Sequence, residues 1–69
     1  MSNLNKIEKF QIFCLEKYKD NLNISGDVAL NIFLEYDIFS YLDEVYDLLH
    51  TQSLDYTYQE IIKYIESKK

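Results

Sequence analysis

Apolar residues recur with the 3.6-residue period of an α-helix along the whole chain, and this periodicity is what most constrains the fold. No stretch shows the clean alternation of apolar and polar residues that a half-buried strand would have. Proline is absent and Gly26 is the only glycine, which argues against a turn-rich β fold. The 69 residues leave room for one small domain. The sequence therefore predicts a single all-α domain over residues 1–69, a compact bundle of four short helices.

Capping residues indicate where these helices begin, because their side chains can accept from the free backbone N–H groups of a first turn. We predict that the first helix spans Leu4–Lys19. Later helices are expected to begin after Ser25, at Ser40 and at Thr57, the last two through capping boxes with an acidic residue three positions on. Asp37 is expected to close the second helix, since Asp tolerates turn conformations.

The apolar stripe of each helix gives the predicted core. Its members are Leu4, Ile7, Phe10, Cys14, Leu15, Tyr18, Val28, Ala29, Ile32, Phe33, Tyr36, Tyr41, Leu42, Val45, Leu48, Leu49, Tyr58, Ile61, Ile62 and Ile65. Ile12, Phe13, Leu30 and Leu34 fall outside these stripes. Either they form an exposed protein-binding patch, or the bundle buries its first two helices on two sides. The sequence leaves both readings open.

Charge is unevenly distributed within the net charge of −5. Residues 20–62 contain nine acidic residues and no Lys or Arg, whereas both ends of the chain carry a small excess of Lys. Such a segment repels phosphate backbones, so we do not expect the chain alone to bind nucleic acid. It would steer the protein towards a basic partner surface. The alternative is that the acidic surface only aids solubility.

Candidate catalytic and metal-binding residues are few. Asp43, Asp47 and His50 share one helix face, a spacing that could hold a divalent metal or provide acid–base catalysis. One imidazole beside two unconstrained carboxylates more simply makes a solvated face. Cys14, the only cysteine, lies between apolar neighbours without an activating base. We therefore predict no metal, no cofactor and no enzymatic activity.

The longest apolar run is the four residues Ile12–Leu15, far too short for a membrane span or the core of a signal peptide. We therefore expect no membrane association and a cytoplasmic location.

Four segments resemble a known family: Phe10–Tyr18, Asn23–Gly26, Asp37–Leu42 and Tyr46–Gln52. The family comprises short bacterial proteins catalogued as a domain of unknown function. The resemblance covers about residues 8–65, and Leu49–Gln52 is its most specific part. Members are often encoded beside a larger ADP-ribosyltransferase-like protein, an arrangement that resembles a toxin–antitoxin pair. The resemblance thus implies an antitoxin-like inhibitor of this co-encoded toxin. It supplies no catalytic motif, and Asp37 stands where relatives are expected to have Gly.

We therefore predict a protein-binding module that occludes a protein partner. The candidate contact residues are Phe13, Leu30, Leu34, Asp43, Asp47, His50, Thr51 and Gln52. For residues 50–52 the alternative role is a helix C-cap, in which polar groups satisfy the last free carbonyls. For the protein as a whole, the alternative is a self-associating structural or regulatory module, such as a homodimer, without a toxin partner.

Overall fold

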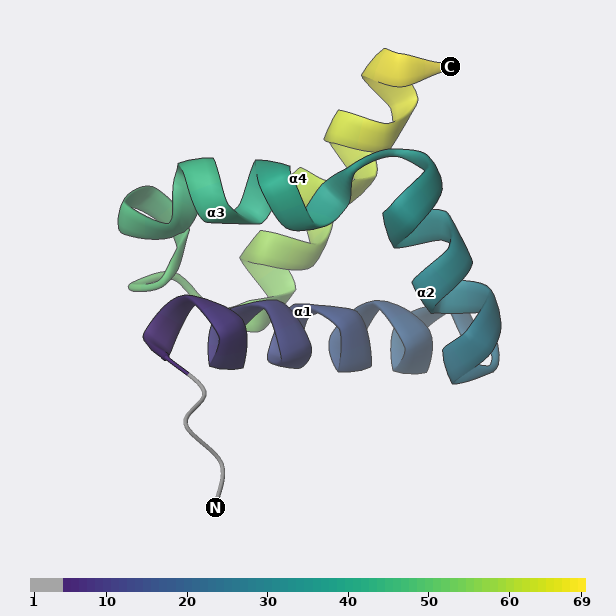
Figure 1. Ribbon diagram of the computed structural model, residues 1–69, viewed down its shortest axis with the longest axis horizontal. Helices are drawn as coiled ribbons and strands as arrows, with labels where there is room; N and C mark the ends of the chain where they lie inside the picture. The colour runs from purple at the N-terminus through teal and green to yellow at the C-terminus, as the bar shows by residue number, and fades with distance from the viewer. Residues whose placement is uncertain (1–4) are drawn as a thin grey trace.

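Helix α1 packs against all three of the other helices (Figure 1). The computed structural model describes residues 5–69, which form four helices and no strand. They are α1 (Lys6–Leu22), α2 (Gly26–Glu35), α3 (Ile38–Leu49) and α4 (Leu54–Lys68). Each of α2, α3 and α4 packs on α1, and α2 also packs on α3. The predicted all-α fold with four helices is confirmed.

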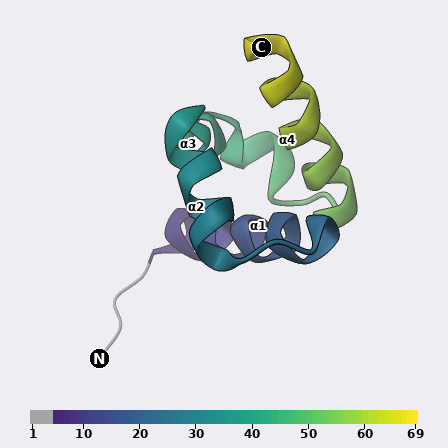
Figure 2. The ribbon, with the colours of Figure 1, turned by 90° about the vertical axis from the view of Figure 1, so that its right-hand side faces the viewer.

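The backbones of α3 and α4 diverge, although both rest on α1. Figure 2 shows them standing apart above α1. A salt bridge of 2.6 Å joins Lys17 in α1 to Asp55 in the first turn of α4. On the other side, Gln11 Nε2 of α1 donates to the carbonyl oxygen of Phe39 in α3, at 2.8 Å. Both helices are thus joined to α1, and they meet one another through the stacked rings of Tyr41 and Tyr64.

Helix α1 begins and ends differently from the prediction, whose first residue, Leu4, lies outside the described residues. Asn5 caps the helix: its side chain accepts from Glu8 N at 2.8 Å, and Glu8 Oε1 accepts from Asn5 N at 3.0 Å. The predicted end at Lys19 is wrong, because helical hydrogen bonding continues to Leu22. Asn23 then adopts the left-handed conformation, with φ 54°, that commonly terminates a helix.

Only one of the three later helix starts agrees with the prediction. Ser25 caps α2, accepting from Val28 N at 3.2 Å. Helix α3 begins at Ile38 rather than at Ser40, because Asp37 turns the chain with a left-handed φ of 55° and directs Ile38 fully into the core. The predicted capping box of Ser40 with Asp43 is therefore wrong. Asp37 does occupy the turn assigned to it.

Helix α4 begins at Leu54, three residues before the predicted start. Ser53 is the N-cap and accepts from Tyr56 N at 3.1 Å. The capping box predicted for Thr57 with Glu60 is wrong, because Thr57 lies within α4 and is buried. It shares this buried stripe with Ile61 and Ile65, each one turn further along.

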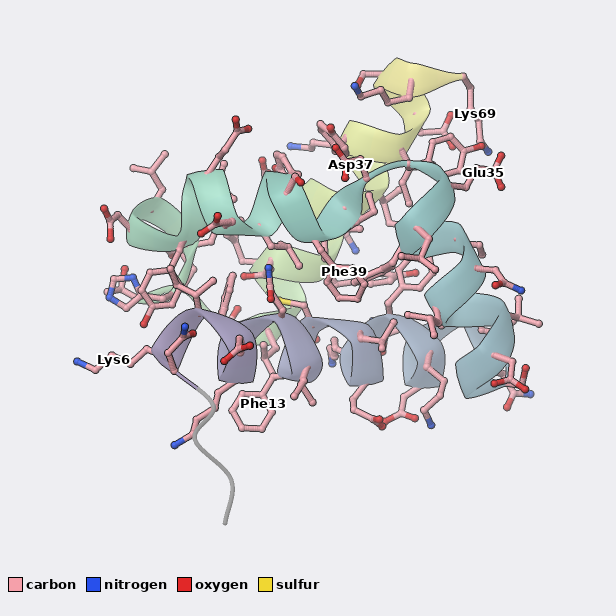
Figure 3. All side chains as sticks on the ribbon, viewed as in Figure 1. Lys6, Phe13, Glu35, Asp37, Phe39 and Lys69 are labelled. Carbon is pink, nitrogen blue, oxygen red and sulfur yellow. The ribbon has the colours of Figure 1, made fainter. Side chains whose placement is uncertain are left out.

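The core lies where α1 faces the other three helices. Its central ring is Phe33, which is fully buried and meets the rings of Tyr18 and Phe39 edge-on, each at a centroid distance of 5.3 Å. Figure 3 shows Phe39 pointing into the space between α3 and α1. Two residues predicted to be buried, Val28 and Leu48, are exposed. Both lie at the edge of their stripe, and their side chains reach solvent.

Ile12, Phe13, Leu30 and Leu34 are exposed, as the first of the two readings requires. Within the described residues, no helix combines the length and the apolar character needed to cross a membrane.

Candidate protein-binding surfaces

A groove of about 280 Å³ opens where α3 and α4 diverge. Its α3 wall carries Tyr41, Val45 and Leu48, spaced so that they share one side of the helix. Tyr56, in the first turn of α4, lies opposite. Leu48 is 73% exposed and Tyr56 is 48% exposed. We call this feature the α3–α4 groove: it presents apolar side chains to solvent between two helices fixed in place by α1.

Polar and aromatic groups complete the α3–α4 groove. Tyr41 stacks on Tyr64 of α4, with centroids 4.0 Å apart and planes 18° apart. Burial, followed by the nearby Glu60 carboxylate, raises the pKa of Tyr41, so its phenol remains neutral at ordinary pH. Gln52 and Glu60 also line the groove. It is therefore largely apolar, with polar groups that can orient a bound segment.

The surface of α2 and α3 is strongly acidic. Within residues 5–69, none of the six carboxylates of the segment 26–49 forms a salt bridge. These are Asp27, Glu35, Asp37, Asp43, Glu44 and Asp47. Glu44 follows Tyr41 by three residues and precedes Leu48 by four, so it borders the apolar side of the groove. Unneutralised carboxylates thus lie beside the exposed apolar side chains.

A second hollow, of about 260 Å³, lies between the first half of α1 and the end of α3. It is lined by Lys6, Lys9, Phe10, Phe13, Tyr46 and His50. We call it the α1–α3 hollow. In Figure 3, Lys6 projects from the first turn of α1, and Phe13 lies on the side of α1 that faces away from α3.

His50 closes α3 while it lines the α1–α3 hollow. Its backbone N–H donates to the carbonyl oxygen of Tyr46 at 2.9 Å, and its Nδ1 lies 2.7 Å from that same oxygen. Since a carbonyl oxygen only accepts, Nδ1 is the donor. The imidazole also stacks on the Tyr46 ring, with centroids 4.5 Å apart. His50 thus occupies the C-cap position that the alternative assigns to it, and within residues 5–69 its Nε2 has no hydrogen-bond partner.

The predicted contact residues do not form one site. Phe13 and His50 both line the α1–α3 hollow. Gln52 instead lines the α3–α4 groove, and its backbone N–H donates to the carbonyl oxygen of Leu49 at 2.9 Å. Thr51 is exposed in the turn after α3.

The remaining four contact candidates line neither the α3–α4 groove nor the α1–α3 hollow. Asp43 and Asp47 are exposed on α3, and Leu30 and Leu34 are exposed on α2. Sequence reasoning did not single out Leu48 or Tyr56. Leu48 has a signal of its own, since it sits one residue after Asp47 and four after Glu44, at the acidic margin of its helix.

Metal and nucleophile chemistry find little support among the described residues. No three His, Cys, Asp or Glu side chains of residues 5–69 are placed to hold a metal ion. Asp43, Asp47 and His50 therefore do not form a metal site. Cys14 is buried, and burial raises the pKa of its thiol to about 12. Its thiol therefore stays protonated at neutral pH, the form that is a poor nucleophile.

The fold and these surfaces define a small all-α protein whose distinctive features are exposed apolar side chains next to unneutralised charge. Residues 9–68 match the family described as "Protein of unknown function (DUF3791)", and the chain belongs to this family. The matched residues contain the whole α3–α4 groove. No curated protein and no solved structure matches the chain.

Proposed function

We propose that this chain is a non-enzymatic protein-binding module that inhibits a protein partner by covering part of its surface. The observation that carries this proposal is the α3–α4 groove, where Leu48 and Tyr56 remain exposed. Glu44, which forms no salt bridge within residues 5–69, lies one helical turn before Leu48 on α3. Burying a side chain such as Leu48 in an interface contributes about 1.5–3 kcal/mol. Tyr is among the residues that most often dominate binding energy.

Charge determines which partner surface suits this groove. The acidic residues of α2 and α3 would accelerate encounter with a basic surface and would disfavour an acidic one. Because none of them is neutralised within the described part of the chain, a partner's Lys and Arg side chains could approach without breaking a salt bridge. The proposed partner surface is therefore basic, with apolar side chains that enter the groove.

The partner is proposed from the family resemblance. Relatives that the sequence resembles are often encoded beside an ADP-ribosyltransferase-like protein, so we propose that the chain is the antitoxin-like member of such a pair in the bacterial cytoplasm. Inhibition would act by occlusion, which needs no catalytic group in the inhibitor.

Co-expression with the neighbouring gene product tests this proposal. We expect the two proteins to co-purify and the small chain to relieve the toxicity of the larger one. If they neither co-purify nor alter toxicity, the antitoxin proposal is wrong.

Two matched variants locate the contact surface. Leu48→Ser is expected to weaken binding about tenfold or more, because it removes an apolar anchor from the groove. Leu34→Ser is the control, since Leu34 is 62% exposed on α2 and lies outside both hollows. Loss of binding in Leu34→Ser and not in Leu48→Ser would move the interface from the α3–α4 groove to α2.

Self-association is the second candidate, and the exposed apolar side chains also favour it. They occur on all four helices: Ile12, Phe13, Leu22, Val28, Leu30, Leu34, Leu48, Leu54 and Tyr56. Multi-angle light scattering of the isolated chain distinguishes the two candidates. A stable dimer that Leu48→Ser dissociates would support a homodimer closed through the groove, and a monomer would exclude it.

A further inference from the structure

The α1–α3 hollow has a chemistry opposite to that of the α3–α4 groove. We propose that it binds an acidic peptide segment, with an aromatic side chain of the segment against Phe13 and its carboxylates on Lys6 and Lys9. This site is separate from the groove and does not depend on the function proposed above.

The hollow is built on a regular stripe of α1. The stripe starts at Lys6 and continues three, four and seven residues later with Lys9, Phe10 and Phe13. This spacing places all four on one side of the helix. Phe10 is nearly buried and meets the Tyr46 ring edge-on, at a centroid distance of 5.3 Å and an angle of 80°. Phe13, by contrast, is 57% exposed. Phe13 is therefore the ring that a ligand can cover, whereas Phe10 and Tyr46 are already packed against one another.

The two lysines of the hollow differ from the other lysines in the described part of the chain. Four of those form salt bridges with carboxylates: Lys17, Lys19, Lys63 and Lys69. Lys68 lies over the Tyr64 ring, 5.0 Å from its centroid. Within residues 5–69, Lys6 and Lys9 have neither kind of partner, and residues 1–4 contain no Asp or Glu.

Local helix stability does not account for these lysines. Cations near the start of a helix oppose its dipole, typically at a cost of about 0.3–1 kcal/mol each. The nearest carboxylate along the chain, that of Glu8, is held by the backbone N–H of Asn5. Positions that break a local rule without compensation are expected at functional or strained sites. Two ammonium groups that have no salt-bridge partner in the described part of the chain, beside an exposed ring, favour a ligand that carries both an anion and an apolar surface.

His50 adds directional chemistry to the hollow. Its Nδ1 is engaged by the Tyr46 carbonyl, so Nε2 is the ring nitrogen left for a ligand. The stacked rings of His50 and Tyr46 form a firm side to the hollow. Because Nδ1 carries the proton, Nε2 of the neutral ring is an acceptor. A carboxylate of the bound segment would thus meet the two ammonium groups of Lys6 and Lys9, and a backbone N–H of the segment could donate to Nε2.

Size and net charge favour a peptide over a nucleotide. The volume of about 260 Å³ falls below the range of about 300–1,000 Å³ typical of small-molecule sites, so the hollow suits one side chain rather than a base, sugar and phosphates together. The chain's net charge of −5 also penalises a polyanion more than a segment with one or two carboxylates.

Titration of the isotope-labelled full chain, followed by NMR, tests the proposal. The probe is the capped peptide acetyl-Gly-Asp-Phe-Asp-Gly-amide, compared with peptides in which Lys replaces both Asp residues or Ala replaces Phe. We expect saturable shifts around residues 6–13 and 46–50 with the probe only. Shifts centred on the α3–α4 groove, or none that saturate, would overturn the proposal. So would AMP binding at the same residues more tightly than the probe.

Variants with the same net charge distinguish binding at a defined site from general electrostatic attraction between peptide and protein. The double variant Lys6→Gln, Lys9→Gln is expected to weaken probe binding about five- to tenfold, since two ion pairs are lost. The double variant Lys68→Gln, Lys69→Gln changes net charge equally and is expected to weaken it less than twofold. Equal losses in the two double variants would mean that no defined site exists. Circular dichroism of each variant establishes that it is folded, and Phe13→Ala, which alters an exposed side chain, checks the apolar contact independently.

Discussion

Thr57 presents a buried polar group that the fold does not satisfy. It is 1% exposed, and its Oγ1 has no hydrogen-bond partner among the described residues. A buried hydroxyl without a partner costs about 1–3 kcal/mol relative to water. Thr57→Val replaces the hydroxyl with a methyl group of similar size, and Thr and Val have similar helix propensities. We therefore expect Thr57→Val to raise the free energy of unfolding by about 1–2 kcal/mol.

Thermal unfolding followed by circular dichroism measures this effect. For a domain of this size, 1 kcal/mol corresponds to a shift of about 4–8 °C in the melting temperature. Thr51→Val is the matched control, since Thr51 is exposed and its replacement should change stability by no more than about 0.5 kcal/mol. Thr57→Ser should lower stability, because it keeps the hydroxyl and removes a buried methyl. A melting temperature for Thr57→Val at or below that of the parent chain would refute the reasoning.

Three further predictions concern stability. Phe33→Ala is expected to lower the free energy of unfolding by about 3–5 kcal/mol and to abolish cooperative unfolding in so small a chain. Leu34→Ala, at an exposed position, should change it by less than about 0.5 kcal/mol. Urea titrations measure both effects. Asp37→Gly should raise the melting temperature and Asp37→Val lower it, because only Gly adopts the left-handed φ of 55° without strain. Burial raises the pKa of Cys14 from its ordinary 9.0 to about 12, so the unfolded chain loses this proton first as pH rises. The stabilisation that the protonated Cys14 thiol gives the folded state is complete below about pH 9 and declines between about pH 9 and 12. Urea unfolding midpoints that fall as steeply over this pH range in Cys14→Ala as in the parent chain would contradict this prediction.

The number of helices and most of their inner faces follow from the sequence, because the 3.6-residue period needs only local information. Helix starts were harder to place. Ser53 and Thr57 both qualify as N-caps of the last helix, and only the stripe of Thr57 with Ile61 and Ile65 indicates that Thr57 is inside it. Asn5 with Glu8 is an Asn version of the capping box and could have been recognised. The start of α3 depends on the backbone conformation of Asp37, which composition alone does not determine.

The candidate surfaces were only partly predictable, for a different reason. The sequence indicates Phe13 because this residue lies off the apolar stripe of its own helix, which is a local property. The periodicity places Leu48 in the predicted core because it belongs to the apolar stripe of its helix, whereas its exposure depends on whether another helix covers the edge of that stripe. No local pattern reports the divergence of two helices that are both fixed to a third. Grooves between helices are therefore the features that sequence periodicity is least able to locate.

The groove also links binding to stability. A 69-residue chain buries a smaller fraction of its surface than a larger domain does, so apolar area left in solvent is a substantial loss of stabilisation. Gln11 and the Lys17–Asp55 salt bridge join α3 and α4 to α1, and Leu48 and Tyr56 remain exposed where the two helices diverge. A ligand that binds only the folded chain must raise its melting temperature. If the groove is the binding surface, Leu48→Ser should leave the melting temperature of the free chain nearly unchanged. At a partner concentration of about 100 times Kd, a tenfold weaker complex should lose about half of the stabilisation that the partner produces.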